Sequence, residues 1–243
     1  MGLFQVTTER VAGLLNKYCM RIGTSNMPKL HSPFKRSNIG GRYVCIPEIE
    51  EDYRWVFEDS IAVEKLDGTN VSVWIQDNQI KGIKNRENII DIWSKGGDRF
   101  YNGVSTALQR GYFNPLDMKD GGHYGELIGS SIRANPYRLD GQVWVPFNHL
   151  LKKSEYRFWQ DMLQNLKGRS DDVIYSEMSN LFKGLWSLYK RQRGFKDKPE
   201  VVTDNTGFEG LASEGIIFYS RDLKRMAKLR RDMFDWYKGK GHK

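Results

Sequence analysis

Length, composition and charge limit the classes of protein to which this chain can belong. Its 243 residues are enough to bury the core of one or two domains. A content of 39% hydrophobic and 13% aromatic residues excludes an intrinsically disordered chain. The formal net charge of +8 favours a polyanionic partner, because contacts with phosphates release bound counterions.

Cysteine content and hydropathy indicate the compartment. Cys19 and Cys45 form neither a zinc-binding spacing nor a disulfide framework, which is typical of a reducing environment. No run approaches the roughly 18 consecutive apolar residues of a transmembrane helix, and the N-terminus has no apolar signal segment. We therefore expect a soluble, cytoplasmic protein with no membrane partner, located in the host cytoplasm if the protein is viral.

Hydrophobic periodicity predicts a mixed order of helices and strands. In chain order the expected elements are a helix over 7–21, loops with short strands over 22–50, a β-meander at 61–66, 71–76 and 79–84, a helix over 99–110, strands at 122–128 and 142–147, a helical block at 154–167 and 171–192, strands at 214–219 and 225–230, and a short terminal helix. Strands near both ends with helices between them predict an α+β fold in which antiparallel sheets enclose a cleft.

Lys65 stands at the end of an apolar, β-rich run and is followed by Asp67-Gly68-Thr69-Asn70, a sequence typical of a tight turn. A lysine in this position is half-buried, and desolvation can lower its pKa toward neutrality and free the amine as a nucleophile. A lysine beside a glycine turn is more often a solvated hairpin residue, so these residues do not establish the role by themselves.

The stretch Lys65-Leu66-Asp67-Gly68 resembles motif I of the covalent nucleotidyltransferases, which comprise ATP-dependent polynucleotide ligases and mRNA capping enzymes. Four further stretches resemble the later motifs of this superfamily in the same order. They are His123–Gly129 for motif III, Val143–Phe147 for motif IIIa, Ser213–Phe218 for motif IV and Met226–Arg230 for motif V. Five ordered motifs are far more specific than any one of them.

This resemblance implies the ATP-grasp-like nucleotidyltransferase fold of ligases, with a nucleotide cleft between antiparallel sheets and helices at the periphery. We expect a single nucleotidyltransferase domain over residues 1–243 with an N-terminal extension over 1–60. Because Arg230 stands close to the end of a chain of 243 residues, we expect no C-terminal OB domain. The resemblance also implies ATP and a divalent cation, Mg²⁺ or Mn²⁺, and we expect a monomer.

Lys65, Lys228 and Arg230 are the candidate catalytic residues. Lys65 would form a lysyl-AMP adduct and release pyrophosphate. Side chains two positions apart on a strand share a face, so Lys228 and Arg230 can together face Lys65 and bind phosphate. Taken alone, a Lys-x-Arg pair is more often a solvated strand face. Motif V usually carries Lys-x-Lys, so Arg230 departs from the usual pattern while it keeps the positive charge.

The remaining nucleotide contacts follow from motif context. Carboxylates accept hydrogen bonds from hydroxyls and are hard ligands for Mg²⁺. The resemblance assigns Glu126 to the ribose hydroxyls and Glu214 to the metal. Phe147 is the predicted aromatic partner of adenine, with Trp144 as second choice, although aromatic residues in a strand are more often core. The full predicted set of cofactor-binding residues is Glu64, Asp67, Gly68, Glu126, Phe147, Glu214 and Lys228.

Asn70 points to the RNA ligase branch of the superfamily. DNA ligases and capping enzymes typically carry Arg at this position, whereas the bacteriophage RNA ligases carry Asn. In those enzymes the Asn and an Arg after the second strand handle the RNA 5′-phosphate, and Arg86 matches that Arg. Lys35 and Arg36 also resemble the N-terminal segment of phage RNA ligases, although a basic surface loop would look the same.

We therefore predict an ATP-dependent RNA ligase that joins 5′-phosphate and 3′-hydroxyl ends, a reaction suited to RNA repair. The partners would be RNA ends, with DNA as the alternative. Two other functions remain open at this point, namely a minimal ATP-dependent DNA ligase and a degenerate nucleotidyltransferase fold that only binds nucleic acid.

Overall fold

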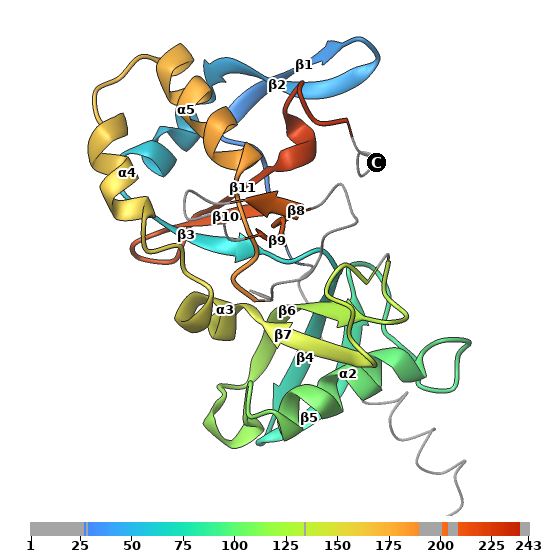
Figure 1. The fold of residues 1–243 in the computed structure, drawn as a ribbon. Coiled ribbons are helices and arrows are strands. Elements are labelled where there is room, and N and C mark those ends of the chain that lie inside the picture. Colours follow the sequence, from blue (N-terminus) through green and yellow to red (C-terminus); the bar gives the residue numbers. More distant parts are fainter. Residues whose placement is uncertain (1–26, 28, 134, 190–200, 204–208, 239–243) are drawn as a thin grey trace, which may run out of the picture. The chain divides into compact units, whose positions relative to one another are not determined.

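The computed structural model describes residues 27, 29–133, 135–189, 201–203 and 209–238 (Figure 1). This part of the chain divides into two compact units. Unit 1 contains Met27 and Gly68–His149, and unit 2 contains Lys29–Asp67 together with the chain from Leu150 onward. The helix predicted over 7–21 lies outside the described residues. One functional domain can contain two such units, so the single nucleotidyltransferase domain stays a prediction.

Unit 1 is built on a four-stranded antiparallel sheet with the strand order β5-β4-β6-β7. Val71 and Leu127 are fully buried on its apolar face. The adjacent helix approaches this face so closely that a Cβ at Gly103 would lie 2.1 Å from Leu127 Cδ1. The elements of unit 1 are β4 (Thr69–Gln76), β5 (Gln79–Asn85), α2 (Asp98–Gln109), the 3-10 helix η2 (Pro115–Asp117), β6 (Gly121–Gly129) and β7 (Gln142–Pro146).

Unit 2 contains a three-stranded antiparallel sheet with the strand order β11-β10-β3 and two separate strand pairs, β1-β2 and β8-β9. Its strands are β1 (Phe34–Ile39), β2 (Arg42–Ile49), β3 (Ser60–Lys65), β8 (Val201–Thr203), β9 (Glu209–Leu211), β10 (Gly215–Ser220) and β11 (Met226–Arg230). Its helices are η1 (Glu51–Phe57), α4 (Trp159–Leu166), α5 (Asp171–Lys183) and η3 (Arg231–Met233). The chain passes between the two units within α3 (Phe147–Lys153).

The core of unit 2 lies against one face of the three-stranded sheet. Ile216, Phe218 and Leu229 are fully buried there, and they belong to the same cluster as Trp159 of α4 and Phe182 of α5. Because strand side chains alternate between faces, residues 65, 215, 217, 228 and 230 point to the opposite face. The core thus fixes the orientation of the sheet and leaves the second face available for a polar site.

The predicted α+β class, a mixture of helices and antiparallel sheets, is confirmed. The helix predicted over 99–110 and the strand predicted at 122–128 match α2 and β6 closely. The helix predicted over 171–192 is too long, because α5 ends at Lys183 and Trp186 forms a β-bridge. The short terminal helix is a 3-10 turn. The β1-β2 hairpin was expected as loop with short strands, although its Gly40-Gly41 turn is a hairpin signal.

The predicted meander of residues 61–66, 71–76 and 79–84 is wrong in its pairing. The three strands exist, but β3 pairs with β10 of unit 2, whereas β4 and β5 belong to the sheet of unit 1. Asp67 and Gly68 carry the chain from one sheet to the other. A Cβ at Gly68 would lie 2.4 Å from the Leu127 carbonyl oxygen, so the chain runs against β6 here and does not turn back along β3.

No helix within the described ranges is long and apolar enough to cross a membrane.

The sheet of unit 2 has no room for a side chain at Gly215. A Cβ there would lie 2.1 Å from the Leu229 carbonyl oxygen, which belongs to the backbone of β11. We predict that Gly215→Ala separates β10 from β11 and costs about 1–3 kcal/mol, as overpacking typically does. The melting temperature should fall by several degrees. Gly184→Ala is the control, because nothing lies within 4 Å of its Cβ position. Equal melting temperatures for the two variants would contradict this assignment.

Candidate active site

Lys65, Gly215 and Arg230 form a row across three neighbouring strands. Gly215 of β10 pairs directly with Lys65 of β3 on one side and with Arg230 of β11 on the other. Directly paired residues point to the same face of a sheet, so Lys65 and Arg230 flank a position that has no side chain. Lys228 pairs with Ile217 and lies on this face as well. The structure therefore brings together the three cationic residues that the sequence predicted as catalytic.

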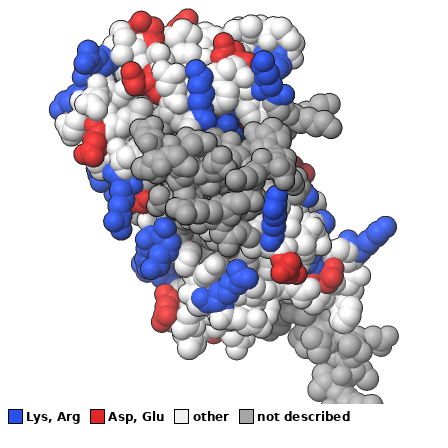
Figure 2. All heavy atoms as spheres, in the orientation of Figure 1, with Lys and Arg blue, Asp and Glu red and all other residues white. Residues whose placement is uncertain are grey.

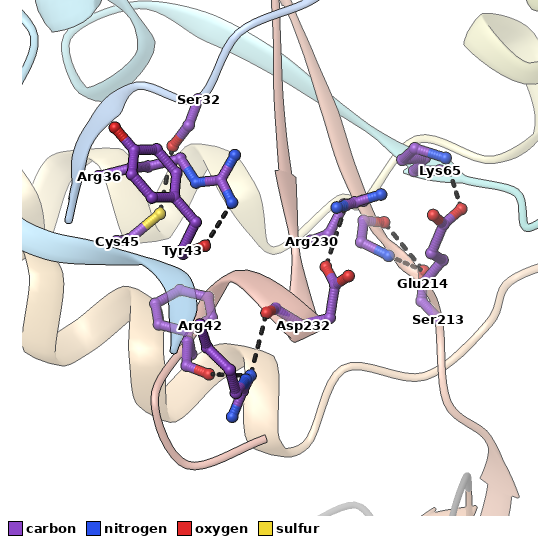
Figure 3. Close-up of polar contacts among 12 residues, drawn as sticks. Ser32, Arg36, Arg42, Tyr43, Cys45, Lys65, Ser213, Glu214, Arg230 and Asp232 are labelled. Atoms are coloured by element: carbon purple, nitrogen blue, oxygen red, sulfur yellow. Dashed lines mark hydrogen bonds and ion pairs between the residues drawn. The ribbon is translucent and has the colours of Figure 1, made fainter. Parts of the chain in front are cut away.

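Glu214 pairs with the candidate nucleophile. Its carboxylate accepts a hydrogen bond from Lys65 Nζ (Figure 3), and the exposed fractions of the two side chains are 8% and 17%. Ser213 fixes the turn that carries Glu214, because its hydroxyl donates to the Gly215 carbonyl at 2.9 Å and accepts from the Gly215 N–H at 3.3 Å. A lysine amine must lose its proton before it can act as a nucleophile, and the Glu214 carboxylate lies against the Lys65 amine.

Arg230 has a charged neighbour that was not among the predicted site residues. Its Nε lies 3.0 Å from Asp232 Oδ1, and the exposed fractions of the two side chains are 16% and 5%. The backbone of Asp232 is held in turn by Arg42, whose guanidinium donates to the Asp232 carbonyl at 3.2 Å (Figure 3). Asp232 stands two residues after motif V, and that spacing is the signal by which the sequence could have suggested it.

Glu64 points away from this row. It is fully buried, and its Oε2 accepts hydrogen bonds from the backbone N–H groups of Leu188 at 2.8 Å and Tyr189 at 2.7 Å. Burial raises the pKa of Glu64 to about 7, although hydrogen bonds from Ser187 and the two N–H groups oppose the shift. The described contacts give Glu64 a structural task, and its contact with the cofactor stays a prediction.

In unit 1, Asn70 and Glu126 pair directly across β4 and β6 and therefore share a face. Both side chains are half-buried. The Asn70 amide lies 3.0 Å from Met27 Sδ and 3.5 Å from the Gly125 carbonyl. Arg86 is exposed directly after β5, whose last residue, Asn85, pairs with Val71 of β4. The two residues predicted to handle the 5′-phosphate thus belong to one unit, with Asn70 on β4 and Arg86 directly after the adjacent strand β5.

The two aromatic candidates for the adenine partner, Trp144 and Phe147, differ in burial. Trp144 is fully buried, its indole N–H donates to the Val71 carbonyl at 3.1 Å, and its ring packs edge-on against Phe113. Trp144 is therefore a core residue of unit 1. Phe147 is half-buried at the start of α3 and stays the candidate partner of adenine.

The remaining predicted site residues lie in other places. Asp67 and Gly68 lie where the chain passes from unit 2 to unit 1, and Lys35 and Arg36 lie on β1.

The donor set fits a divalent cation that is bound together with substrate. The described residues contain no group of three or more His, Cys, Asp or Glu side chains that could form a complete protein cage. Mg²⁺ commonly keeps several waters and binds through one or two carboxylates plus substrate phosphates. Glu214, beside three cations suited to phosphate, matches that mode of binding.

Comparison with known proteins gives distant likenesses. No family model matches this chain, and no curated protein matches it. Among solved structures, the chain is similar to an RNA ligase of Naegleria gruberi with PPi, at 16% identity, a TM-score of 0.43, and coverage of 71% of this chain and 49% of that one. A mutant of the same enzyme with ATP and Mn gives 16% identity, a TM-score of 0.45, and coverage of 87% and 60%.

A further mutant of that ligase, with AMP and Mn, gives 15% identity, a TM-score of 0.45, and coverage of 85% of this chain and 61% of that one. In these three comparisons the chain spans between 49% and 61% of the length of the ligase. Likenesses at these TM-scores carry no conclusion about activity, so a functional assignment depends on the residues themselves.

Glu64 predicts a pH dependence of stability. Its pKa is about 7 in the folded chain, whereas an ordinary glutamate has a value of 4.5. Between these values the folded state binds more protons than the unfolded state, so the free energy of unfolding falls as pH rises. The loss attributable to Glu64 is on the order of 3 kcal/mol between pH 4.5 and 7.

Denaturant unfolding of the wild type and Glu64→Gln across this pH range measures the effect. Gln keeps an oxygen that can accept from Leu188 and Tyr189 but carries no titrating proton. We expect the stability of the wild type relative to Glu64→Gln to fall steadily as the pH rises. A pH-independent difference between the two proteins would show that Glu64 does not titrate in this range.

Proposed function

We propose that this chain is an ATP-dependent RNA ligase of the bacteriophage type, which joins 5′-phosphate and 3′-hydroxyl ends. The observation that carries the proposal is the row Lys65–Gly215–Arg230, with Glu214 paired to Lys65 and Lys228 on the same face. The motif resemblance assigns these residues to a single reaction independently of the fold. Their meeting on one sheet face supports that assignment.

The first step is an adenylyl transfer. Lys65 Nζ loses a proton and attacks the α-phosphorus of ATP, so that a P–N bond forms, the bond to the bridging oxygen breaks, and pyrophosphate leaves. Lys228 and Arg230 neutralise charge on the phosphates, and Arg230 can donate two hydrogen bonds at once. The Arg230 guanidinium lies beside the Asp232 carboxylate, with its Nε 3.0 Å from Oδ1, so a charged neighbour is in place before substrate binds. This preorganisation suits electrostatic stabilisation of the transition state.

The two later steps involve RNA. An oxygen of the 5′-phosphate attacks the adenylyl phosphorus, so that a P–O–P bond forms, the P–N bond to Lys65 breaks, and the lysine amine is restored. The 3′-hydroxyl then attacks the same 5′-phosphorus, forms the phosphodiester and releases AMP. Arg86 and Asn70 would hold the 5′-phosphate, because a guanidinium can bind a phosphate through two hydrogen bonds. Their common position on unit 1 supports a shared task.

The nucleoside contacts follow the motif assignments. Glu126 would accept hydrogen bonds from the ribose hydroxyls, Phe147 would stack on adenine, and Asp67 with Gly68 would line the phosphate end of the nucleotide. Glu214 would hold Mg²⁺ or Mn²⁺, which supplies additional charge neutralisation when bound. The same carboxylate pairs with Lys65, so cation binding and the ion pair compete for its oxygens.

Incubation with α-labelled ATP followed by denaturing electrophoresis tests the proposal. The wild type should retain label at 28.3 kDa after denaturation, and Lys65→Ala should retain none. ATP should label better than GTP or NAD⁺. Label that persists in Lys65→Ala would remove the nucleophile assignment, and better labelling from GTP would point to capping chemistry.

Arg86→Ala separates the steps of the reaction. Without the guanidinium the 5′-phosphate dianion has no charged partner, so joining should fail while Lys65 is still adenylylated. The measurement compares lysyl-AMP yield with joining of 5′-phosphorylated RNA in the variant and the wild type. Normal joining by a folded Arg86→Ala variant would contradict the role of Arg86. Efficient sealing of DNA nicks by the wild type, with no joining of RNA ends, would favour a DNA ligase.

A further inference from the structure

The β1-β2 hairpin of unit 2 presents an unusual surface. Its tip carries two large exposed side chains, Ile39 at 53% and Tyr43 at 59% exposure. Gly40 and Gly41, at φ +59° and +81°, form the tight turn between the two strands. From residue 35 to 47 the sequence contains three cations and no Asp or Glu. Tyr43 pairs with Asn38 and Ile39 pairs with Arg42, so Tyr43 and Ile39 point to opposite faces of the hairpin.

The ring of Tyr43 is held in place on one side. The guanidinium of Arg36 lies over it, 4.8 Å from the ring centroid, and also donates to the Tyr43 main-chain carbonyl (Figure 3). The guanidinium covers one face of the ring, and the side chain is still more than half exposed. An aromatic ring that is fixed on one side and open on the other is prepared to stack on a flat ligand without further loss of side-chain entropy.

The charge of the hairpin favours an anionic strand. The described hydrogen bonds of Arg42 go to the main-chain carbonyls of Asp232, Phe234, Asp235 and Tyr237. Neutral carbonyls leave its positive charge uncompensated, and the same holds for the bond from Arg36 to the Tyr43 carbonyl. Lys35 does pair with Glu48, at 2.9 Å. Figure 2 shows side chains of both signs of charge over the visible surface.

We propose that the β1-β2 hairpin binds an unpaired nucleotide of the RNA strand, with the base stacked on Tyr43 and the backbone phosphates near Arg36 and Lys35. This inference deepens the proposed function and rests on it for the identity of the strand. Every base offers a π-face, so stacking tolerates any sequence. A base inside a duplex has both faces covered, so the exposed ring of Tyr43, which we call the stacking platform, selects single-stranded ends or loops.

The position of the hairpin relates this platform to the catalytic row. Arg42, next to Tyr43 on β2, donates to the carbonyl of Asp232, and the Asp232 carboxylate pairs with Arg230. The hairpin is therefore fixed to the strand end that carries Arg230, within unit 2. A strand bound at Tyr43 is held by the unit that carries Lys65.

Fluorescence anisotropy with the full chain, without ATP, tests the platform. The probes are a labelled 5′-phosphorylated oligoadenylate and the same strand within a long blunt duplex. Tyr43→Ala should weaken binding of the single strand by roughly five- to a hundredfold, which corresponds to the removal of one stacked base. Tyr43→Phe keeps the ring and should bind as the wild type does. Thermal melting of each variant verifies that it is folded.

The salt dependence of RNA binding distinguishes the contribution of base stacking from the contribution of charge. Tyr43→Ala should leave the slope of log affinity against log salt unchanged, whereas Arg36→Ala should lower it by about 0.7 for each phosphate that is no longer neutralised. Wild-type affinity for the single strand in a folded Tyr43→Ala variant would overturn the proposal. An equal weakening of binding to single strand and duplex would overturn it too, as would specific capture of a protein through Tyr43 with no RNA binding.

The result is distinguishable from failure of the proposed function. Lysyl-AMP formation by the wild type is read without RNA, so a chain that adenylylates Lys65 but shows no Tyr43-dependent binding retains the ligase assignment and loses the platform. A chain that binds single-stranded RNA through Tyr43 but never forms the adduct retains the platform and loses the ligase assignment.

Discussion

The pairing of β10 with both β3 and β11 is the constraint on which the candidate site depends. Lys65, Gly215 and Arg230 are far apart in the sequence, and antiparallel register alone places them in one row. Gly215 leaves the centre of the row without a side chain, and its Cβ position is blocked by the backbone of β11. A shift of one residue in the β3–β10 pairing would move Lys65 to the core face, and the same shift in the β10–β11 pairing would move Lys228 and Arg230 there.

Two adjacent residues of β3, Glu64 and Lys65, lie on opposite faces of the three-stranded sheet of unit 2 and have different environments. Lys65 is half-buried on the face of the row, whereas Glu64 is fully buried on the other face and accepts two backbone hydrogen bonds. A buried carboxyl group is costly, and the pKa of about 7 records that cost. Glu64 thereby ties β3 to the segment of Leu188 and Tyr189, which helps to fix the strand that presents the nucleophile.

Local pattern predicted much of this arrangement, and long-range pairing accounts for what it missed. The alternation of residues predicted Lys65 at a strand end and the shared face of Lys228 and Arg230. It could not predict that β3 pairs with β10. Alternation with a period of two shows which side chains share a face of a strand, but it does not show which strand lies beside it. The hydrogen bond from Arg42 ends at the main-chain carbonyl of Asp232. Every residue has such a carbonyl, so no local sequence pattern could indicate this bond.

The most direct test of the central claim is the single-turnover rate of lysyl-AMP formation in Arg230→Ala. Arg221→Ala is the matched control, because Arg221 belongs to the same unit but pairs with Asp59 at 2.8 Å. If the row acts as one site, Arg230→Ala should react roughly ten- to a hundredfold more slowly, as expected when one charged interaction is removed, and Arg221→Ala should match the wild type. A folded Arg230→Ala variant that reacts at the wild-type rate would contradict the account.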